Sequence, residues 1–165
     1  MSEKADDLDW IGFRRNQFST RLPATYLYNP AHYWLCRDAD CLWRVGFTGF
    51  ATRMLGEVVE FEFEVKAGET VEVAQCLGWI EGFKATSDLV SVAGGEFAEF
   101  NRTVADDPSV ICKRPYTRGW LYGVRGEPDT LSVDVHGYMA HLEATIDKML
   151  EKPFKTPELP DGSRS

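Results

Sequence analysis

The sequence predicts an α+β protein that is mainly β: a flattened barrel or sandwich of two small sheets with a C-terminal helix packed alongside. Apolar and acidic residues alternate from Glu57 to Val65, as in a strand with one face in a core. Residues 57–80 and 89–124 each read as strand, glycine turn, strand, which suits two similar β halves folded onto each other. An apolar stripe across residues 131–149 follows helical spacing.

The composition is that of a single globular domain rather than a disordered chain. The 165 residues are 44% hydrophobic and 27% charged, enough for a real core. A net charge of -8 argues against binding to nucleic acid or to anionic membrane surfaces. No apolar run approaches the roughly 18 residues that span a bilayer. The sequence therefore predicts neither nucleic acid nor membrane as partner, and a monomer is expected.

The N-terminus is acidic and polar from residue 1 to 7, unlike a signal peptide. A cytoplasmic location is expected, so the four cysteines are interpreted as thiols rather than structural disulfides. We expect an N-terminal extension over residues 1–30, the main domain over 31–152 and a flexible tail over 153–165. The extension either packs on the body or docks a partner. Its apolar residues lie near helical spacing: Leu8, Trp10, Ile11, Phe13 and Phe18.

The main domain is expected to begin with an antiparallel hairpin. Residues 33–36 and 42–46 read as its strands, with a polar turn between them. Residues 50–55 suit one or two helical turns that Gly56 ends. After the acidic strand, residues 70–80 read as one returning strand.

Later elements are expected from turn residues and periodicity. Strands at 89–93 and 96–100 are separated by a turn at Gly94-Gly95. Residues 101–113 read as a loop with a helical turn, and 119–124 as the closing strand. The final helix can be capped by Ser132 or Asp134.

A single lysine, Lys84, stands between the strand that ends at Ile80 and the apolar run that starts at Leu89. Its neighbours are mostly small and polar, which predicts a hairpin tip. A lysine there has a flexible stem and a compact ammonium group that water reaches. It is suited to modification by another enzyme and poorly suited to act as a buried base.

Residues 81–88 read Glu-Gly-Phe-Lys-Ala-Thr-Ser-Asp, with Gly95 eleven residues after the lysine, and resemble the lipoyl-lysine hairpin of glycine cleavage system H proteins. The resemblance covers about 120 residues, from roughly 30 to 150. Further motifs match in the same order: His32-Tyr33-Trp34, 45–51, 55–59, Gly95-Glu96, Asn101, Asp107-Pro108 and 115–121.

The resemblance implies a lipoyl-domain-like barrel-sandwich hybrid whose Lys84 carries lipoate in amide linkage. The chain would be a carrier rather than an enzyme, with no catalytic residue of its own. Its arm would shuttle a bound group and electrons between enzymes. The implied partners include lipoate-attachment enzymes and a dihydrolipoamide dehydrogenase-type enzyme.

The residues around Lys84 are candidate recognition residues for the attaching enzyme. The charges of Glu81 and Asp88 could let the enzyme recognise the hairpin, and Gly82, which has no side chain, would keep the hairpin narrow. Alternatively, both carboxylates simply face solvent. Phe83 could shelter the dithiolane of the arm, or it could be a core residue at the strand end. Gly95 completes the hairpin pattern of the family.

Some segments depart from the glycine cleavage pattern: 53–57, 79–84 and 133–138. These resemble the H-like lipoate-binding proteins of bacterial sulfur oxidation, which are associated with a heterodisulfide-reductase-like complex. That resemblance implies an arm that carries sulfur intermediates. One alternative is an H protein that carries an aminomethyl group among glycine cleavage components. Another is an unmodified H-like interaction module.

Cys36 and Cys41 form a C-x4-C pair on the first hairpin. They are interpreted as two buried or half-exposed thiols, with a cross-strand disulfide or sulfur-handling role as the alternative. The chain offers no further ligands at matching spacing, so no metal site is expected. His136 and His141 lie five apart on the last helix and do not share a face.

Overall fold

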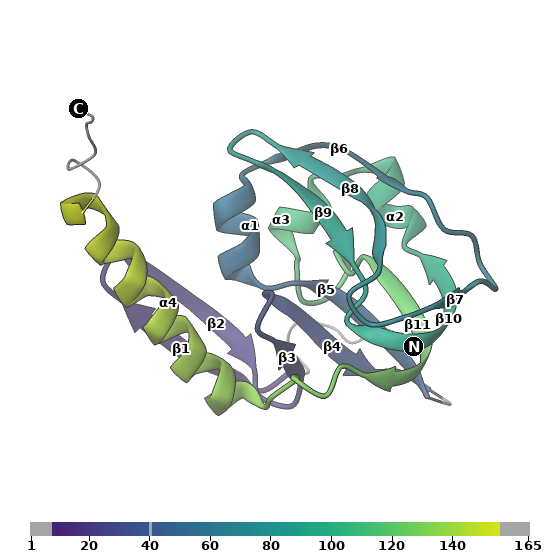
Figure 1. Ribbon diagram of the computed structural model, residues 1–165, viewed down its shortest axis with the longest axis horizontal. Helices are drawn as coiled ribbons and strands as arrows, with labels where there is room; N and C mark the ends of the chain where they lie inside the picture. The colour runs from purple at the N-terminus through teal and green to yellow at the C-terminus, as the bar shows by residue number, and fades with distance from the viewer. Residues whose placement is uncertain (1–7, 40, 156–165) are drawn as a thin grey trace.

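A computed structural model describes residues 8–39 and 41–155 of the chain. Within these residues the chain forms eleven strands and four helices (Figure 1). In order they are β1 (Trp10–Arg15), β2 (Phe18–Pro23), β3 (Leu27–Asn29), β4 (Tyr33–Arg37), β5 (Leu42–Phe47), α1 (Gly49–Leu55), β6 (Val58–Phe63), β7 (Thr70–Val71), β8 (Cys76–Gly82), β9 (Thr86–Val90), β10 (Ala93–Phe100), α2 (Arg102–Asp106), α3 (Val110–Lys113), β11 (Tyr122–Pro128) and α4 (Val135–Lys155).

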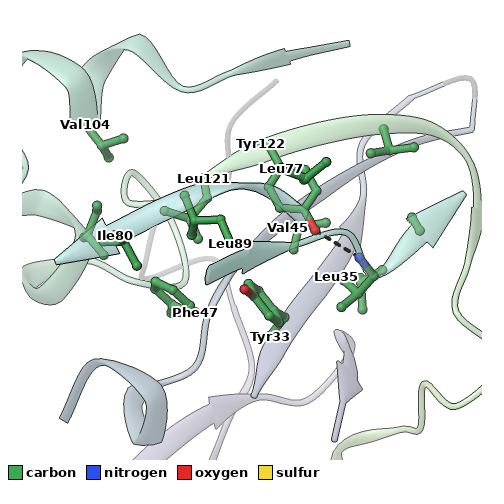
Figure 2. Packing of buried hydrophobic residues seen from close by; sticks show 14 of the residues in the cluster. Tyr33, Leu35, Val45, Phe47, Leu77, Ile80, Leu89, Val104, Leu121 and Tyr122 are labelled. Atoms are coloured by element: carbon green, nitrogen blue, oxygen red, sulfur yellow. Dashed lines mark hydrogen bonds between the residues drawn. The ribbon is translucent and has the colours of Figure 1, made fainter. Parts of the chain in front are cut away.

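Two sheets enclose the main core, and neither closes into a barrel. One has six strands in the order β3-β4-β5-β11-β10-β7, and the other has three in the order β6-β8-β9. Buried side chains from both sheets meet between them, as Figure 2 shows for Tyr33, Leu77, Ile80, Leu89 and Tyr122. The predicted α+β, mainly β, flattened barrel-sandwich is confirmed.

The expected first hairpin is present as β4 and β5. Cys36 lies opposite Arg44 in its register. Because side chains alternate along a strand, Tyr33 and Leu35 enter the core between the sheets, whereas Trp34 packs in a second cluster on the other face of β4. The two faces of β4 therefore belong to different environments.

The expectation of one strand over 70–80 is wrong. β7 ends at Val71, and a turn follows in which the Gln75 N–H donates to the Glu72 carbonyl oxygen at 3.0 Å. Ala74 in this turn has a φ of 74°. The chain changes sheets here, since β7 pairs with β10 whereas β8 pairs with β6 and β9.

The expectation of a turn at Gly94-Gly95 is also wrong. Both glycines lie inside β10, where Gly95 is paired with Gly126 of β11. The φ of Gly95 is 148°, and a Cβ there would lie 2.0 Å from the Arg125 carbonyl oxygen. A close approach of two strands, rather than a turn, requires glycine at this position.

The 101–113 segment is more helical than expected, because it contains both α2 and α3. The side chain of Asn101 caps α2 by accepting from the Thr103 N–H at 3.0 Å. The closing strand starts at Tyr122 rather than 119, after a turn in which Gly119 N–H donates to the Arg114 carbonyl oxygen at 2.8 Å.

The N-terminal extension forms the β1–β2 hairpin instead of the helix its spacing suggested. Phe13 and Phe18 of this hairpin are buried in one cluster with Tyr138 and Leu142 of α4. In Figure 1 the hairpin and α4 lie side by side next to the sandwich. The extension therefore packs on the body, as the first interpretation held, and its last residues, in β3, already belong to the six-stranded sheet.

The final helix, α4, begins at Val135, four residues after Leu131, where the apolar stripe of the sequence starts. Leu131 is 65% exposed and outside the helix, and the Asp134 carboxylate accepts from the Gly137 N–H at 2.9 Å, which makes Asp134 the cap. α4 continues to Lys155, so the first three residues of the expected tail are helical. Residues 156–165 lie outside the described part of the chain. None of the described helices is long and apolar enough to cross a membrane.

Candidate functional site

Lys84 lies at the tip of the β8–β9 hairpin, as predicted. Glu81 and Thr86 form the last strand pair before the tip. The Gly82 N–H donates to the Ala85 carbonyl oxygen at 2.8 Å and closes the turn. The side chain of Lys84 is exposed. The hairpin thus presents one amine at its end.

The tip rests on the C-terminal end of α1 and on the residues that follow it. The Phe83 N–H donates to the Glu57 carbonyl oxygen at 2.9 Å, and the Lys84 N–H donates to the Leu55 carbonyl oxygen at 3.0 Å. The Nζ of Lys84 donates to the Arg53 carbonyl oxygen at 3.1 Å. The last carbonyls of a helix have no partner within the helix, so the tip satisfies groups that would otherwise need water.

Two glycines allow this close contact. Gly56 has a φ of 80°, and a Cβ there would lie 2.9 Å from the Lys84 Cγ. A Cβ at Gly82 would lie 2.2 Å from the Leu55 carbonyl oxygen. Gly82 must therefore lack a side chain because it approaches the end of α1, and its role in recognition by an attaching enzyme stays a prediction.

The amine of Lys84 is available for acylation. Among the described residues no carboxylate forms an ion pair with it. Its acceptor is a neutral backbone carbonyl at the surface, which water can replace at little cost. The lysine side chain lies back against the end of α1 rather than extending into solvent.

The residues beside Lys84 are on the surface. Phe83 is 77% exposed, so the interpretation of this ring as a core residue is wrong. Glu81 and Asp88 are exposed as well, and Asp88 is paired with Trp79 across the hairpin. Two carboxylates and one aromatic ring are therefore exposed on the hairpin near Lys84, and their recognition by an attaching enzyme stays a prediction.

A groove of about 400 Å³ lies beside the hairpin, between α1 and β9. Its lining is mostly apolar and includes Phe47, Phe50 and Met54. His32 also lines it; burial, and secondarily the neighbouring His141, lowers the pKa of His32 to about 4, so its ring is neutral at pH 7. Asp88 is the one carboxylate among the lining residues.

The remaining candidate residues lie away from the tip. Gly95 is in the six-stranded sheet, where its close approach to β11 accounts for it. Cys36 and Cys41 do not form a disulfide, and Cys36 lies across from Arg44 rather than Cys41. Cys36 is half-buried, as interpreted, whereas Cys41 is exposed. No group of three metal-binding side chains occurs in the described residues.

The sequence analysis did not identify the carbonyl oxygens of Arg53 and Leu55 as acceptors for Lys84. Every residue has a backbone carbonyl, so the residue type at these positions gives no indication of this role.

The fold and the site define a class: small β-sandwich domains that present one exposed lysine at a hairpin tip. Comparison with known proteins identifies the family within it. The family model for the glycine cleavage H-protein matches residues 26–148. The chain belongs to this family, whose members carry lipoate covalently attached to a lysine.

Individual relatives cover the same region. A glycine cleavage system H protein of Streptomyces avermitilis is 39% identical over 115 residues, which are 68% of this chain and 91% of the relative. A glycine cleavage system H protein of Escherichia coli O7:K1 is 30% identical over 127 residues, which are 75% of this chain and 98% of the relative. The crystal structure of a glycine cleavage system H protein from Mycobacterium marinum superposes with a TM-score of 0.67 at 31% identity, covering 73% of this chain and 98% of that one.

Proposed function

We propose that Lys84 is the lipoyl attachment residue and that the arm carries sulfur intermediates between the enzymes of a cytoplasmic, heterodisulfide-reductase-like sulfur oxidation system. The observation that supports the attachment site is the exposed Lys84 amine, held at a hairpin tip by a neutral carbonyl and next to an apolar groove. These features fit an amide-linked lipoyl group. Such a group supplies a cyclic disulfide that thiolates open and re-form.

The chain's own residues provide presentation and shelter. The bonds of the Phe83 and Lys84 N–H groups to the end of α1 fix the base of the arm, so that its reach is defined. The groove, of about 400 Å³ and mostly apolar, has room for the apolar end of the arm. Attachment to the protein raises the effective concentration of the arm at a partner's active site to roughly millimolar.

The preference for sulfur cargo rests on the segments 53–57, 79–84 and 133–138, which depart from the glycine cleavage pattern. The exposed ring of Phe83 lies beside Lys84 and is placed to contact the sulfur atoms of the arm itself, whichever group the arm carries, at about 0.3–1.5 kcal/mol for each contact. An aminomethyl cargo would instead carry a cationic amine, which a mostly apolar groove accommodates poorly.

Glycine cleavage is the second candidate. Asp88 lines the groove and could pair with a cationic amine on the arm. The relatives named above are themselves glycine cleavage system H proteins. In that case the partners are the glycine cleavage components.

Intact-mass measurement tests the carrier function. The protein is produced together with lipoate-attachment enzymes, and the mass of the peptide containing Lys84 is measured. A lipoyl adduct on Lys84 is expected. Persistent absence of the adduct would favour the unmodified interaction module and reject the carrier.

An assay of the lipoylated protein separates the two pathways. We would incubate it with the glycine decarboxylase and aminomethyltransferase components and measure free thiols on the arm after addition of glycine. Under the sulfur proposal, glycine produces no more thiol than buffer does. Robust glycine-dependent reduction would overturn the sulfur assignment and leave the carrier function intact.

A further inference from the structure

A second cavity lies on the other side of the six-stranded sheet from the lysine groove. Its volume is about 230 Å³. Trp34 lines this cavity, whereas its neighbour Tyr33 lines the lysine groove. Because successive side chains of β4 point to opposite faces, the two cavities are separated by the strand itself. The carrier function makes no use of the second cavity.

Aromatic rings form its apolar walls. The Tyr26 hydroxyl donates to the Tyr116 carbonyl oxygen at 2.7 Å, and the Trp34 indole N–H donates to the Pro115 carbonyl oxygen at 2.8 Å. The polar atoms of these side chains are thus already bonded. The rings of Tyr26 and Trp34 lie 4.9 Å apart and are tilted against each other. The walls therefore offer flat apolar surfaces rather than hydrogen-bond donors.

The rim of the cavity is positively charged. Within the described part of the chain, Arg37, Arg44 and Arg118 line it together with one carboxylate, Asp38, so that these side chains carry two more positive than negative charges in a chain of net charge -8. The Arg44 Nε donates to Asp38 at 2.9 Å, and the guanidinium lies 4.2 Å from the centre of the Trp120 ring. Among the described residues, Arg37 and Arg118 form no ion pair.

The segment that carries Arg118 is fixed in place. The buried side-chain amide of Asn101 donates to the carbonyl oxygens of Arg118 and Trp120, both at 2.8 Å. The loop between α3 and β11 is therefore held against the sheet, and the cavity wall is formed before any ligand arrives. A preformed site binds without the cost of ordering its own loops.

We propose that this cavity binds a small organic anion, in which a carboxylate or phosphate group adjoins a flat apolar ring. The guanidinium groups of Arg37 and Arg118 bind the oxyanion, since planar guanidinium suits carboxylate and phosphate oxygens. The rings of Trp34, Tyr26 and Trp120 contact the flat part of the ligand. The volume fits a ligand of one ring and one acidic group rather than a long chain.

Four probes test the proposal on the full-length protein: phenyl phosphate, benzoate, inorganic phosphate and benzyl alcohol. Calorimetry measures affinity, and the indole N–H resonances report the location. Phenyl phosphate or benzoate is expected to bind at least about tenfold more tightly than inorganic phosphate and benzyl alcohol. The better of the two ring-bearing anions identifies phosphate or carboxylate as the preferred group. The resonances of Trp34 and Trp120 should shift, whereas that of Trp79, on β8, should not.

Matched arginine variants complete the test. Arg118→Gln should weaken binding of the better anion about tenfold, whereas Arg125→Gln, on the exposed face of β11, should leave it unchanged. Equal affinity for inorganic phosphate and the ring-bearing anions would overturn the proposal, and so would equal weakening by both variants. The absence of saturable binding at millimolar concentrations would overturn it too. None of these results depends on lipoylation, so the proposed carrier function is tested separately.

Discussion

The ammonium group of Lys84 donates a hydrogen bond to the carbonyl oxygen of Arg53 at 3.1 Å. This carbonyl belongs to the last turn of α1, where the helix dipole is negative and the carbonyls lack helical partners. The acceptor therefore orients a cation without neutralising it by an ion pair. The same end of α1 also receives the backbone N–H of Lys84. Orientation of the lysine and its chemical availability thus come from one feature of the fold.

Lys84→Arg should prevent lipoylation while leaving the protein folded. Arginine keeps the positive charge but cannot form the amide with lipoate under the same enzymes. The side chain is exposed, so we expect a change in unfolding free energy within about 0.5 kcal/mol. Intact mass and urea denaturation measure the two effects. Lys66→Arg, in an exposed turn, is the control and should still be lipoylated; a large loss of stability in Lys84→Arg would show that the lysine is structural.

Gly82→Ala should push the hairpin tip away from α1. Its Cβ would lie 2.2 Å from the Leu55 carbonyl oxygen, so the backbone must shift and the bonds from Phe83 and Lys84 weaken. We expect destabilisation of about 2 kcal/mol by urea denaturation, together with slower lipoylation. Gly12→Ala is the control, because a Cβ at Gly12 meets nothing within 4 Å. Equal effects of the two substitutions would contradict the proposed contact.

Much of the fold could be predicted from local patterns. Alternating residues in β6, the polar turn before β5 and Gly56 at the end of α1 each carry a signal in residue type. The position of Lys84 at a tip follows from the two apolar runs on either side of it. These features depend on neighbours in sequence, so periodicity and turn residues are enough to find them.

The remaining features depend on contacts between distant segments. The turn at 72–75 divides one apparent strand because its halves pair with different sheets, and no local residue shows that. Gly95 resembles a turn residue but is required by the close approach of Gly126. In the extension, spacing alone could not distinguish a helix from the β1–β2 hairpin that packs against α4. At the site, Arg53 acts through its carbonyl oxygen, which every residue possesses.

Asn101→Ala should destabilise the protein by about 3 kcal/mol. The side chain is 4% exposed and makes three bonds: one from the Thr103 N–H and two to the carbonyl oxygens of Arg118 and Trp120. Alanine removes the helix cap and leaves buried carbonyls without donors. Urea denaturation measures the loss.

Asn101→Asp separates the two contributions of this side chain. Aspartate still accepts from the Thr103 N–H but cannot donate to the two carbonyl oxygens. We expect this variant to be strongly destabilised as well; stability close to wild type would show that only the cap matters. Ser109→Ala removes a hydroxyl that bonds Asp107 at the surface and should cost less than about 1 kcal/mol.

Acidification should weaken the contact between α4 and the sandwich through His32. The Nδ1 of His32 lies 2.8 Å from the Tyr138 hydroxyl, and burial, then the nearby His141, lowers the pKa of His32 from 6.5 to about 4. Between these pH values the unfolded chain binds a proton that the folded protein does not. The contribution of His32 to the free energy of unfolding is therefore fully present above pH 6.5. It decreases by about 3 kcal/mol as the pH falls towards 4.

The difference in unfolding free energy between wild type and His32→Asn isolates this effect from the carboxylates, which titrate in both proteins. The difference should fall by about 3 kcal/mol from pH 7 to pH 4, because only the wild type must keep a buried imidazole neutral. His136→Asn, which removes an exposed imidazole at the start of α4, is the matched control. A constant difference between wild type and His32→Asn over this range would mean that His32 binds its proton equally well in the folded and unfolded chain, and that the Tyr138 contact does not depend on pH.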